Sequence, residues 1–494
     1  MNALTAQNSA YRQPPAIGNG ARQAVELEPH GSQRSSFIVT VLVLYIFLLS
    51  SRALDVSRVA LLHIPMILLG LLVIATLAKG ELKYALRSKI TVWFLALNAW
   101  VCFCLPFSRW RAGSLPYVII SVESFCVYFL IVQIVRTGKD WRAIAKAYAW
   151  GVLGAALLSI FFGQSVEGRV SVVAGSLADP NEFALRLVLG LPFWWYLASQ
   201  SGPVGKIVSF LLTTPIFISF ARAGSRSALL ALAALFAMMF LFVNLKQKAL
   251  MCAVAVIALV AGIAFLPAYL KVRFTTLFAR QDASQLSQEE RARLGADISS
   301  SESREMLLWQ AIRMSLVHPI VGVGPGVFGD VAWDERKANL GVGGGLLVSH
   351  NTYTQFSSET GIPGFLCFVG TLLLSIKYAL SDYRRNRERD PVIAQGSLYM
   401  FVCLIGLAAG IFFLSVGYGM LPAVLFGLAA SLNMAASSEK SVEQTSLTQS
   451  EPVLDAPRTL ETRPKMQSNL LNGRRVRFGR FAGRGADPSR SRPG

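Results

Sequence analysis

Apolar runs long enough to cross a lipid bilayer recur along most of the chain. Each covers roughly 17 to 25 residues, the length that a helix needs to span about 30 Å of hydrocarbon. The runs begin near Phe37, Val59, Ile90, Leu115, Ala147, Glu182, Ile207, Ser227, Ala249, Gly361, Gln395 and Gly419. A continuous run of this kind satisfies its backbone hydrogen bonds in lipid as a helix. The pattern predicts an all-α polytopic membrane protein with about twelve transmembrane helices.

The composition agrees with this class. Hydrophobic residues make up 53% of the 494 residues and charged residues 15%, which is more apolar surface than a soluble fold can bury. A formal net charge of +19 would suggest nucleic acid as a partner of a soluble protein. In a membrane protein, cationic loops first reflect orientation in the bilayer, so we expect no nucleic-acid partner.

The positions of the cysteines indicate whether a disulfide or metal site is present, and the first residues indicate whether the chain begins with a signal peptide. All six cysteines lie within apolar runs, so neither a disulfide framework nor a thiolate metal site is predicted. Residues 1–35 are polar and lack an apolar core. We therefore expect no cleavable signal peptide and interpret the first run as an uncleaved anchor.

Lysine sets the predicted orientation. With the N-terminus in the cytoplasm, the inward turns hold Lys79, Lys83, Lys89, Arg136, Lys139, Lys146, Lys206, Lys246, Lys248, Arg384, Arg385, Arg387 and Arg389, as the positive-inside rule requires. Five segments follow: a disordered cytoplasmic N-terminus (1–35), a membrane domain of about nine spans (36–270), a large periplasmic loop with short helices (271–360), about three further spans (361–436) and a basic, disordered cytoplasmic tail (437–494). We expect this tail to contact anionic lipid rather than RNA, because its aromatic residues are few.

The short outward loops before the large loop contain arginine and no lysine. The planar guanidinium holds phosphate or carboxylate in bidentate fashion, so an anion on the outward face would explain this bias. Arg169, Arg222 and Arg226 are the better candidates for binding it. Contact with lipid headgroups would equally explain the others. These are Arg52, Arg58, Arg109 and Arg111.

Two ionisable residues fall inside predicted spans, Glu123 in the fourth and Arg186 in the sixth. An unpaired charge in hydrocarbon is costly, so both are expected to face the bundle interior, and we consider them a candidate pair. A structural tether and a place on a substrate path are both compatible with that position.

A helix is predicted within the large loop. Ser299 and Glu302 have the spacing of a capping box, and apolar residues follow at helical intervals until Pro319. Arg304 falls in the first turn, where the helix dipole disfavours a cation. Such placement against local preference is a hint of function, although a surface ion pair with Glu302 or Glu305 would also explain it.

Residues 324–329 match the string G-x-G-x-x-G. The dinucleotide fingerprint requires a preceding strand and a following helix within a βαβ unit. Here the string follows the end of a helix and is interrupted by Pro325. We therefore predict a rigid turn that returns the chain to the membrane.

His350 is the candidate general base. It follows the flexible run Gly343–Gly345 and precedes a segment that is helical if Asn351 or Thr352 caps it. The positive potential at a helix N-terminus and an ordinary pKa of about 6.5 favour a neutral imidazole, as a base requires. With His318 alone it supplies too few ligands for zinc. A loop histidine that only donates or accepts hydrogen bonds is the alternative.

Several strings together resemble the O-antigen ligase and polysaccharide polymerase family. The resemblance runs from about residue 169 to residue 364. Its strings are Asp179-Pro180-Asn181 after Arg169, Arg222-Ala-Gly-Ser-Arg226, Ser303-Arg304, His318-Pro319-Ile-Val-Gly322-Val-Gly324, and His350-Asn351-Thr-Tyr353 ahead of Glu359-Thr-Gly361. Each is short, and their order and the position of the large loop carry the resemblance.

The resemblance implies a metal-independent, cofactor-free glycosyl transfer on the periplasmic face of a bacterial inner membrane. The donor would be an undecaprenyl-diphosphate-linked glycan, and the acceptor another glycan or a lipid A core. By the same resemblance His350 activates the acceptor hydroxyl, and Arg226 and Arg304 hold the diphosphate, with Arg222 and Arg169 as further ligands. Direct attack would invert the anomeric carbon. Other polysaccharide-assembly membrane proteins are possible partners. A polymerase is slightly favoured over a ligase.

Two other classes fit the composition. A transporter or flippase of lipid-linked saccharide predicts two similar halves and charges near the midplane, whereas polarity here gathers in one external loop. A non-enzymatic scaffold predicts that His350 is dispensable. The transferase interpretation makes a geometric claim: His350 and Arg304 converge with Arg226 over a cavity that opens toward lipid.

Overall fold

The computed structural model describes residues 36–54, 63–78, 80, 82–166, 169–172, 179–253, 256, 304–340 and 348–449. The chain divides into two compact units, Met1–Glu443 and Gln444–Gly494. The first unit contains every feature discussed below except the last residues of the C-terminal helix. The segments predicted to be disordered, residues 1–35 and most of the basic tail, lie outside the described residues.

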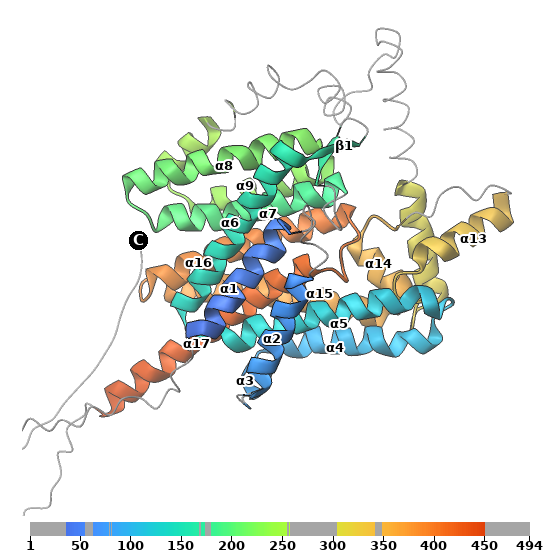
Figure 1. Cartoon of the computed structure of the whole chain (residues 1–494), viewed down its shortest axis with the longest axis horizontal. Helices are drawn as coiled ribbons and strands as arrows, with labels where there is room; N and C mark the ends of the chain where they lie inside the picture. The colour runs from blue at the N-terminus through green and yellow to red at the C-terminus, as the bar shows by residue number, and fades with distance from the viewer. Residues whose placement is uncertain are drawn as a thin grey trace, which may run out of the picture. The chain divides into compact units, whose positions relative to one another are not determined.

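The N-terminal part of the first unit is a series of helices joined by short turns (Figure 1). They are α1 (Ser36–Ser51), α2 (Ile64–Ala78), α3 (Lys83–Leu86), α4 (Lys89–Cys104), the 3-10 turn η2 (Leu105–Phe107), α5 (Arg111–Ile134) and α6 (Gly138–Phe162). A capping box starts α6, because the Asp140 N–H donates to Thr137 Oγ1 at 3.1 Å and the Thr137 N–H donates to Asp140 Oδ2 at 3.3 Å.

A short hairpin and three longer helices follow. Strands β1 (Gln164–Val166) and β2 (Arg169–Ser171) pair antiparallel, with Val166 opposite Arg169. The helices are α7 (Pro180–Ser199), α8 (Pro203–Ala223) and α9 (Arg226–Phe242), and a further helix covers residues 245–253. The turn between α8 and α9 uses Gly224 at φ 58° and the N-cap Ser225, so the chain reverses in two residues.

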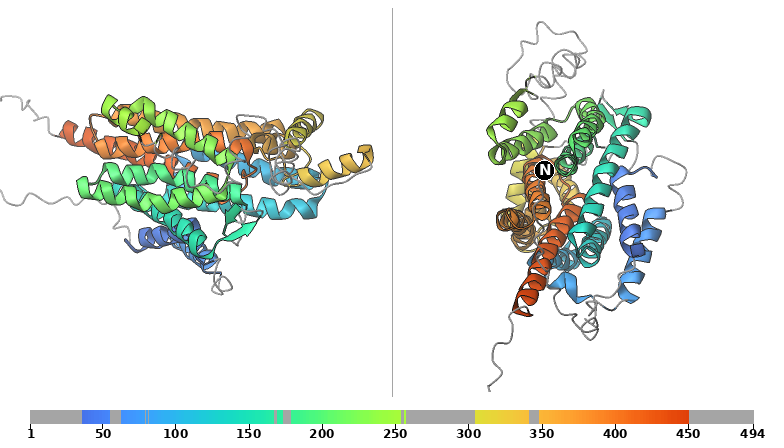
Figure 2. Two further views of the ribbon diagram at one scale, coloured as in Figure 1. Left: turned by 90° about the horizontal axis from the view of Figure 1, so that it is seen from above. Right: turned by 90° about the vertical axis from the view of Figure 1, so that its left-hand side faces the viewer.

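The C-terminal part begins with a helix over residues 304–317. It continues with α13 (Phe328–Leu340), α14 (Thr352–Glu359), α15 (Gly361–Asn386), α16 (Pro391–Gly410), the 3-10 turn η5 (Ile411–Phe413) and α17 (Met420–Gln449). The axes of most long helices lie roughly along one common line, irrespective of chain direction (Figure 1 and Figure 2). These helices include α4, α5, α7, α8, α15 and α16.

Within the described residues, seven helical segments are long and apolar enough to cross a membrane. They are Lys89–Phe107, Arg111–Ile134, Gly138–Phe162, Pro203–Ala223, Gly361–Asn386, Pro391–Phe413 and Met420–Ser438. Three shorter apolar helices correspond to α1, α2 and α9, and the predicted sixth span corresponds to α7. The ninth predicted span, from Ala249, lies largely outside the described residues. The mostly helical membrane architecture is confirmed, and the number of spans stays a prediction.

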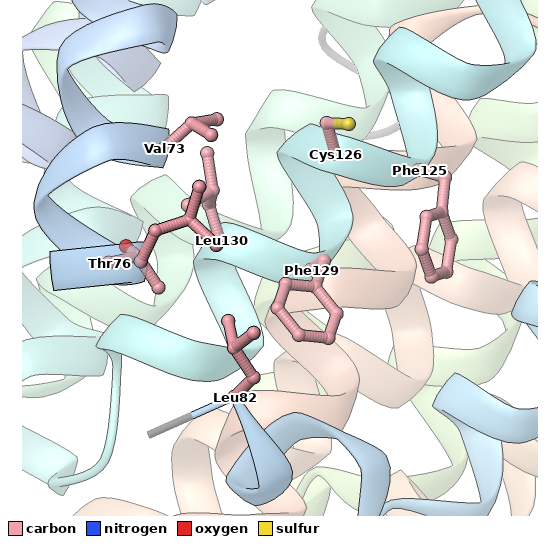
Figure 3. Close-up of a pocket in the computed structure, with 8 residues that line it drawn as sticks. Val73, Thr76, Leu82, Phe125, Cys126, Phe129 and Leu130 are labelled. Atoms are coloured by element: carbon pink, nitrogen blue, oxygen red, sulfur yellow. The ribbon is translucent and has the colours of Figure 1, made fainter. Parts of the chain in front are cut away.

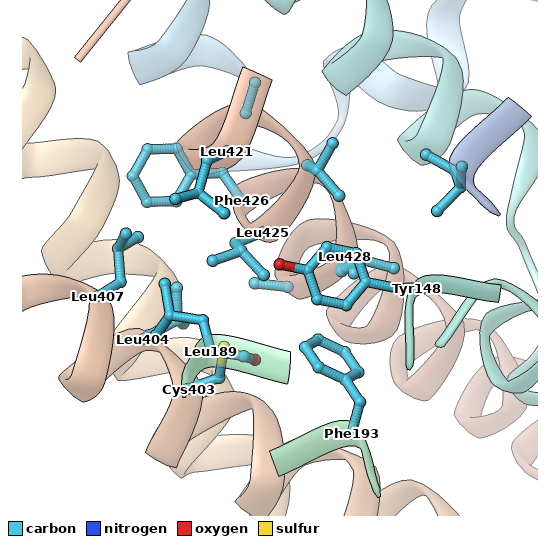
Figure 4. Close-up of a cluster of buried hydrophobic side chains, with 14 of the residues drawn as sticks. Tyr148, Leu189, Phe193, Cys403, Leu404, Leu407, Leu421, Leu425, Phe426 and Leu428 are labelled. Atoms are coloured by element: carbon cyan, nitrogen blue, oxygen red, sulfur yellow. Dashed lines mark hydrogen bonds between the residues drawn. The ribbon is translucent and has the colours of Figure 1, made fainter. Parts of the chain in front are cut away.

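The centre of the bundle is formed by α16 and α17, the most buried of these spans. Figure 4 shows Tyr148 of α6, Leu189 and Phe193 of α7, and leucines of α16 and α17 gathered in one cluster. Small residues allow the close approach: a Cβ on Gly190 would lie 2.5 Å from Val152, and one on Gly410 would lie 2.3 Å from Leu185.

Arg186 has a different neighbour from the one predicted. Its Nη2 lies 3.6 Å from Glu182 Oε1, one turn earlier in α7, and the arginine side chain is 7% exposed. The predicted partner was Glu123. A partner four residues away in the same helix needs no alignment of two helices, which explains why the local pair forms. Arg186 does face the bundle interior, as expected.

Candidate active site

Asn351 fixes the start of α14, directly after His350. Its Oδ1 accepts hydrogen bonds from the backbone N–H of Tyr353 at 2.9 Å and of Thr354 at 3.1 Å. These are two of the N–H groups that a helix leaves without an internal partner. The prediction that this segment is a capped helix is confirmed, with Asn351 as the cap.

The connection between η5 and α17 holds the first turn of α14. Thr352 Oγ1 donates to the Leu414 carbonyl at 2.6 Å and accepts from the Val416 N–H at 3.1 Å. The Ser349 and Ser415 hydroxyls lie 3.0 Å apart. Contacts on both sides of residue 350 therefore tie it to the most buried pair of helices.

The backbone of His350 adopts φ 51°, in the left-handed region. A residue other than glycine is uncommon there, and the strain persists only where the surroundings impose it. Here Ser349 and Asn351, 3% and 4% exposed, are both held by hydrogen bonds. Such over-determined strain is found most often at functional sites.

The His350 imidazole lies in a field that keeps it neutral. Burial lowers the pKa of His350 below its ordinary value, the Arg304 guanidinium lowers it further, and the Asp179 carboxylate acts in the opposite direction. This direction agrees with the neutral ring expected from the sequence, which stays a prediction. The main physical cause is loss of hydration by burial rather than the helix N-terminus.

Asp179 is a charged neighbour of His350 that is not among the site residues predicted from the sequence. Asp179 caps α7 through Oδ1, which accepts from the Asn181 N–H at 2.8 Å and from Asn181 Nδ2 at 3.1 Å. Its charge acts on His350, which is 171 positions later in the chain. The Asp179-Pro180-Asn181 string was noticed as an outward loop, and only the fold reveals its neighbour.

Arg169 joins three segments around the start of α7. Its Nη2 donates to Asn181 Oδ1 at 2.7 Å, and its Nε donates to the Ala223 carbonyl at 2.9 Å. The Ser225 hydroxyl donates to the same Asn181 oxygen at 3.0 Å. Asn181 therefore fixes the α8–α9 turn against the N-terminus of α7, beside Asp179.

The other arginines start or end helices at this turn. Arg226 is the first residue of α9 and is half-buried, and Arg222 lies in the last turn of α8. Arg304 and Asp179 are thus the charged residues that act on the His350 imidazole, and Arg169 bonds to Asn181 beside the Asp179 cap. The convergence of Arg226 and Arg222 on His350, over a cavity open to lipid, stays a prediction.

The helix over residues 304–317 carries Arg304 to His350 by packing against α14. The hydroxyls of Ser315 and Ser357 lie 2.8 Å apart at this contact. Leu307, Ala311 and Met314 are buried in a small cluster with residues of the following turn and α13. The helix predicted in the large loop is confirmed, while its proposed capping box at Ser299 and Glu302 lies outside the described residues.

The glycine string forms a turn, as the sequence predicts, but the turn leads into α13 and not directly back to a membrane-spanning helix. Gly322, Gly324 and Gly326 have φ of 67°, 122° and 73°. The Val323 N–H donates to the Ser358 carbonyl at 2.9 Å, and the Gly324 N–H donates to the Glu359 carbonyl at 3.0 Å. The turn follows a helix and binds the end of α14, so the dinucleotide interpretation is excluded on context.

Glu359 is a second residue that sequence reasoning missed. It is 4% exposed, and its Oε2 accepts from the Gly326 N–H at 2.9 Å. Burial raises the pKa of Glu359 to about 7, against hydrogen bonds from Gly326, Tyr418, Phe328 and Gln355 that lower it. A carboxyl that is partly protonated near neutrality thus joins α14 to the glycine turn.

A separate apolar pocket lies between α2 and α5 (Figure 3). It is lined by Val73, Thr76, Leu77, Leu82, Phe125, Cys126, Phe129 and Leu130. None of the candidate site residues lines it. In the described part of the chain, no group of three metal-ligating side chains converges, and the six cysteines are free.

Comparison with known proteins locates a family segment. A sequence model of the O-antigen ligase family matches residues 208–369. The matched segment contains Arg222, Arg226, Arg304 and His350. Asp179 and Arg169 precede it. No curated protein matches the chain.

Proposed function

We propose that this multi-pass membrane protein, a member of the O-antigen ligase family, transfers a glycan from an undecaprenyl-diphosphate carrier to an acceptor hydroxyl. The transfer takes place at the periplasmic face of the inner membrane. The observation that carries the proposal is that His350, at positive φ directly before α14, feels the charge of the Arg304 guanidinium, and that both residues lie inside the family segment. A neutral imidazole, which has one free ring nitrogen, together with a nearby cation suits a reaction that deprotonates one oxygen and releases another as an anion.

In the proposed step, the acceptor oxygen attacks the anomeric carbon and forms the new glycosidic bond. Its proton passes to a ring nitrogen of His350. The bond between the anomeric carbon and the diphosphate oxygen breaks, and its electron pair remains on undecaprenyl diphosphate. Asp179 then faces an imidazolium, whose positive charge it stabilises.

Arg304 acts on the leaving group. The diphosphate gains negative charge as the bond breaks, so a guanidinium held in place stabilises the transition state more than the ground state. Charge-assisted hydrogen bonds contribute about 1.5 to 3 kcal/mol each. Arg226 and Arg222 are proposed as further ligands. The donors of Arg169 to Ala223 and Asn181 favour a role in positioning the loop.

One displacement at the anomeric carbon inverts its configuration. The Asp179 carboxylate near His350 makes the alternative concrete, since attack by a carboxylate followed by the acceptor would retain configuration. Asp179 is engaged as the α7 cap by two hydrogen bonds, which favours its electrostatic role. A product that retains the donor's anomeric configuration would contradict the proposal.

Replacing His350 with Ala in the native host tests the function. His63→Ala is the matched control, because His63 is an exposed histidine before α2 that also has positive φ. At equal protein level, we expect His350→Ala and Arg304→Lys to block the finished glycan. Accumulated single repeats on the carrier identify a polymerase, and finished but unattached polymer identifies a ligase.

The transporter alternative makes a different prediction for the same strains. Loss of a flippase would leave lipid-linked repeats on the cytoplasmic face, whereas loss of the transferase leaves them on the periplasmic face. Normal amounts of finished glycan in His350→Ala cells would leave the scaffold interpretation in place and reject the catalytic one.

A further inference from the structure

The helix over residues 304–317 is apolar on two opposite sides. One side packs inward through Leu307, Ala311 and Met314, which are at most 2% exposed. The other side presents large hydrophobic side chains to the surface. These are Met306, Trp309, Leu316 and Val317, 41% to 74% exposed, followed by Ile320 at 64%.

The exposed side chains form one continuous stripe. Positions 306, 309, 313 and 316 recur at the three- and four-residue intervals that share a helix face, and Ile320 follows in the turn after the helix ends at residue 317. Arg313, which is exposed, occupies the middle of the stripe. A surface helix in water has a polar outer face, and a contiguous apolar one marks contact with a membrane or a partner.

The end of the helix contacts the connection between two membrane-spanning helices. At the end of the helix, His318 Nε2 lies 3.1 Å from Arg109 Nη2, and the Arg109 N–H donates to the Val323 carbonyl at 3.0 Å. Arg109 lies between α4 and α5. Phe103, Phe107 and Trp110 there are 50% to 55% exposed.

The direction of the helix fits a position along a membrane surface. In Figure 1 the segment before α13 runs across the direction shared by α4, α5 and α15. If those helices cross the bilayer, the helix over residues 304–317 lies along its surface. Aromatic residues and arginines are the side chains that favour the headgroup layer, with rings among the acyl chains and guanidinium groups at phosphates.

We propose that this helix lies in the outer headgroup layer of the membrane. Trp309, Leu316 and Ile320 enter the acyl region, and Arg313 and Arg109 bind lipid phosphates. Charge complementarity and continuity with α4 and α5 favour lipid over a protein partner as the occupant. If the proposed function is correct, the helix also holds Arg304 at the depth where the carrier's diphosphate lies.

Spin labels measure this placement directly. Single cysteines at positions 309 and 316, in a full-length protein with its six cysteines replaced, are labelled in nanodiscs containing anionic lipid. We expect oxygen, which partitions into lipid, to reach both labels several-fold more effectively than a water-soluble nickel chelate. A label at exposed Asp334 of α13 should show the reverse order.

Two results would overturn the proposal. Nickel access at position 316 equal to that at position 334 would place the stripe in water. Exclusion of both reagents at position 316 would mean that protein covers it. Quenching of wild-type fluorescence by brominated lipid, compared with Trp309→Phe, checks the result without replacing the cysteines.

The placement and the proposed function fail in different ways. Label accessibility is expected to be the same in a His350→Ala background, because the stripe does not include the base. A lipid-accessible stripe in a protein whose His350→Ala variant remains active would reject the transferase chemistry alone. A water-accessible stripe in a protein that requires His350 would reject the placement alone.

Discussion

At the scale of single residues, the site depends on two titrating groups whose surroundings oppose their charged forms. His350 is half-buried and feels the charge of the Arg304 guanidinium, and Glu359 is buried at the junction of α14 and the glycine turn. His350 could be found from the sequence, because a histidine ahead of a cappable helix is a local pattern. Glu359 and Asp179 could not, since their importance depends on segments distant in the chain.

The charges around His350 predict opposite shifts of its titration. The pKa of His350 is lowered by burial and by Arg304 and raised by Asp179, so Arg304→Gln should raise it and Asp179→Asn should lower it. Transfer activity should fall as the pH drops through the pKa of each variant, because a protonated ring is no base. Nuclear magnetic resonance of ¹⁵N-histidine-labelled protein, which has four histidines, measures the shifts. An unchanged pKa of His350 in both variants would contradict the assignment of Arg304 and Asp179 as its charged neighbours.

Glu359→Gln should change how stability depends on pH. The pKa of Glu359 is raised to about 7, whereas an unfolded glutamate titrates near about 4.3. The native state therefore binds the extra proton between these values, and the free energy of unfolding falls as pH rises through this window, by roughly 4 kcal/mol in the limit. Glutamine removes this term while it still accepts from Gly326. Thermal unfolding in detergent between pH 4.5 and 8 tests the prediction. If the stability of the wild type and of the variant depended on pH with the same slope, the prediction would be wrong.

At the scale of elements, a helix end could be predicted from the sequence where a nearby residue, such as a cap or a proline, marks it. Asn351 was correctly expected to cap α14, and Pro319 lies in the turn two residues after the end of the helix over residues 304–317. The ion pair of Arg186 with Glu182 was not predicted, because the sequence does not say which helices meet. The glycine turn was recognised, but its attachment to Glu359 required the packing of α14.

Gly322→Ala should disrupt this attachment more than backbone strain alone explains. A Cβ at Gly322 would lie 2.3 Å from the backbone carbon of Glu359, at φ +67°. Gly80 is a matched control, with φ +65° and nothing within 4 Å. Gly80→Ala should cost about 1 to 2 kcal/mol from the left-handed backbone. Gly322→Ala should cost a few kcal/mol more and reduce transfer. Equal losses in thermal stability would show that the contact with α14 does not matter.

At the scale of the whole molecule, the apolar runs predicted the helices well, because hydrocarbon leaves the backbone little choice. They could not predict the site. Asp179 comes from the start of α7, Arg304 from the large loop and His350 from the turn before α14, and they meet only through the fold. The family segment at residues 208–369 contains the base and Arg304 but not Asp179, so the proposed chemistry uses more of the chain than the family match covers.

The most direct test of the account is transfer by the purified protein in proteoliposomes. The host's own lipid-linked glycan serves as donor, and release of undecaprenyl diphosphate is followed with time. We predict that His350→Ala lowers the rate by about 10² to 10⁴-fold, the usual contribution of a general base, while His63→Ala retains the wild-type rate. A His350→Ala rate within a few-fold of wild type, with the protein folded and inserted, would contradict the central claim.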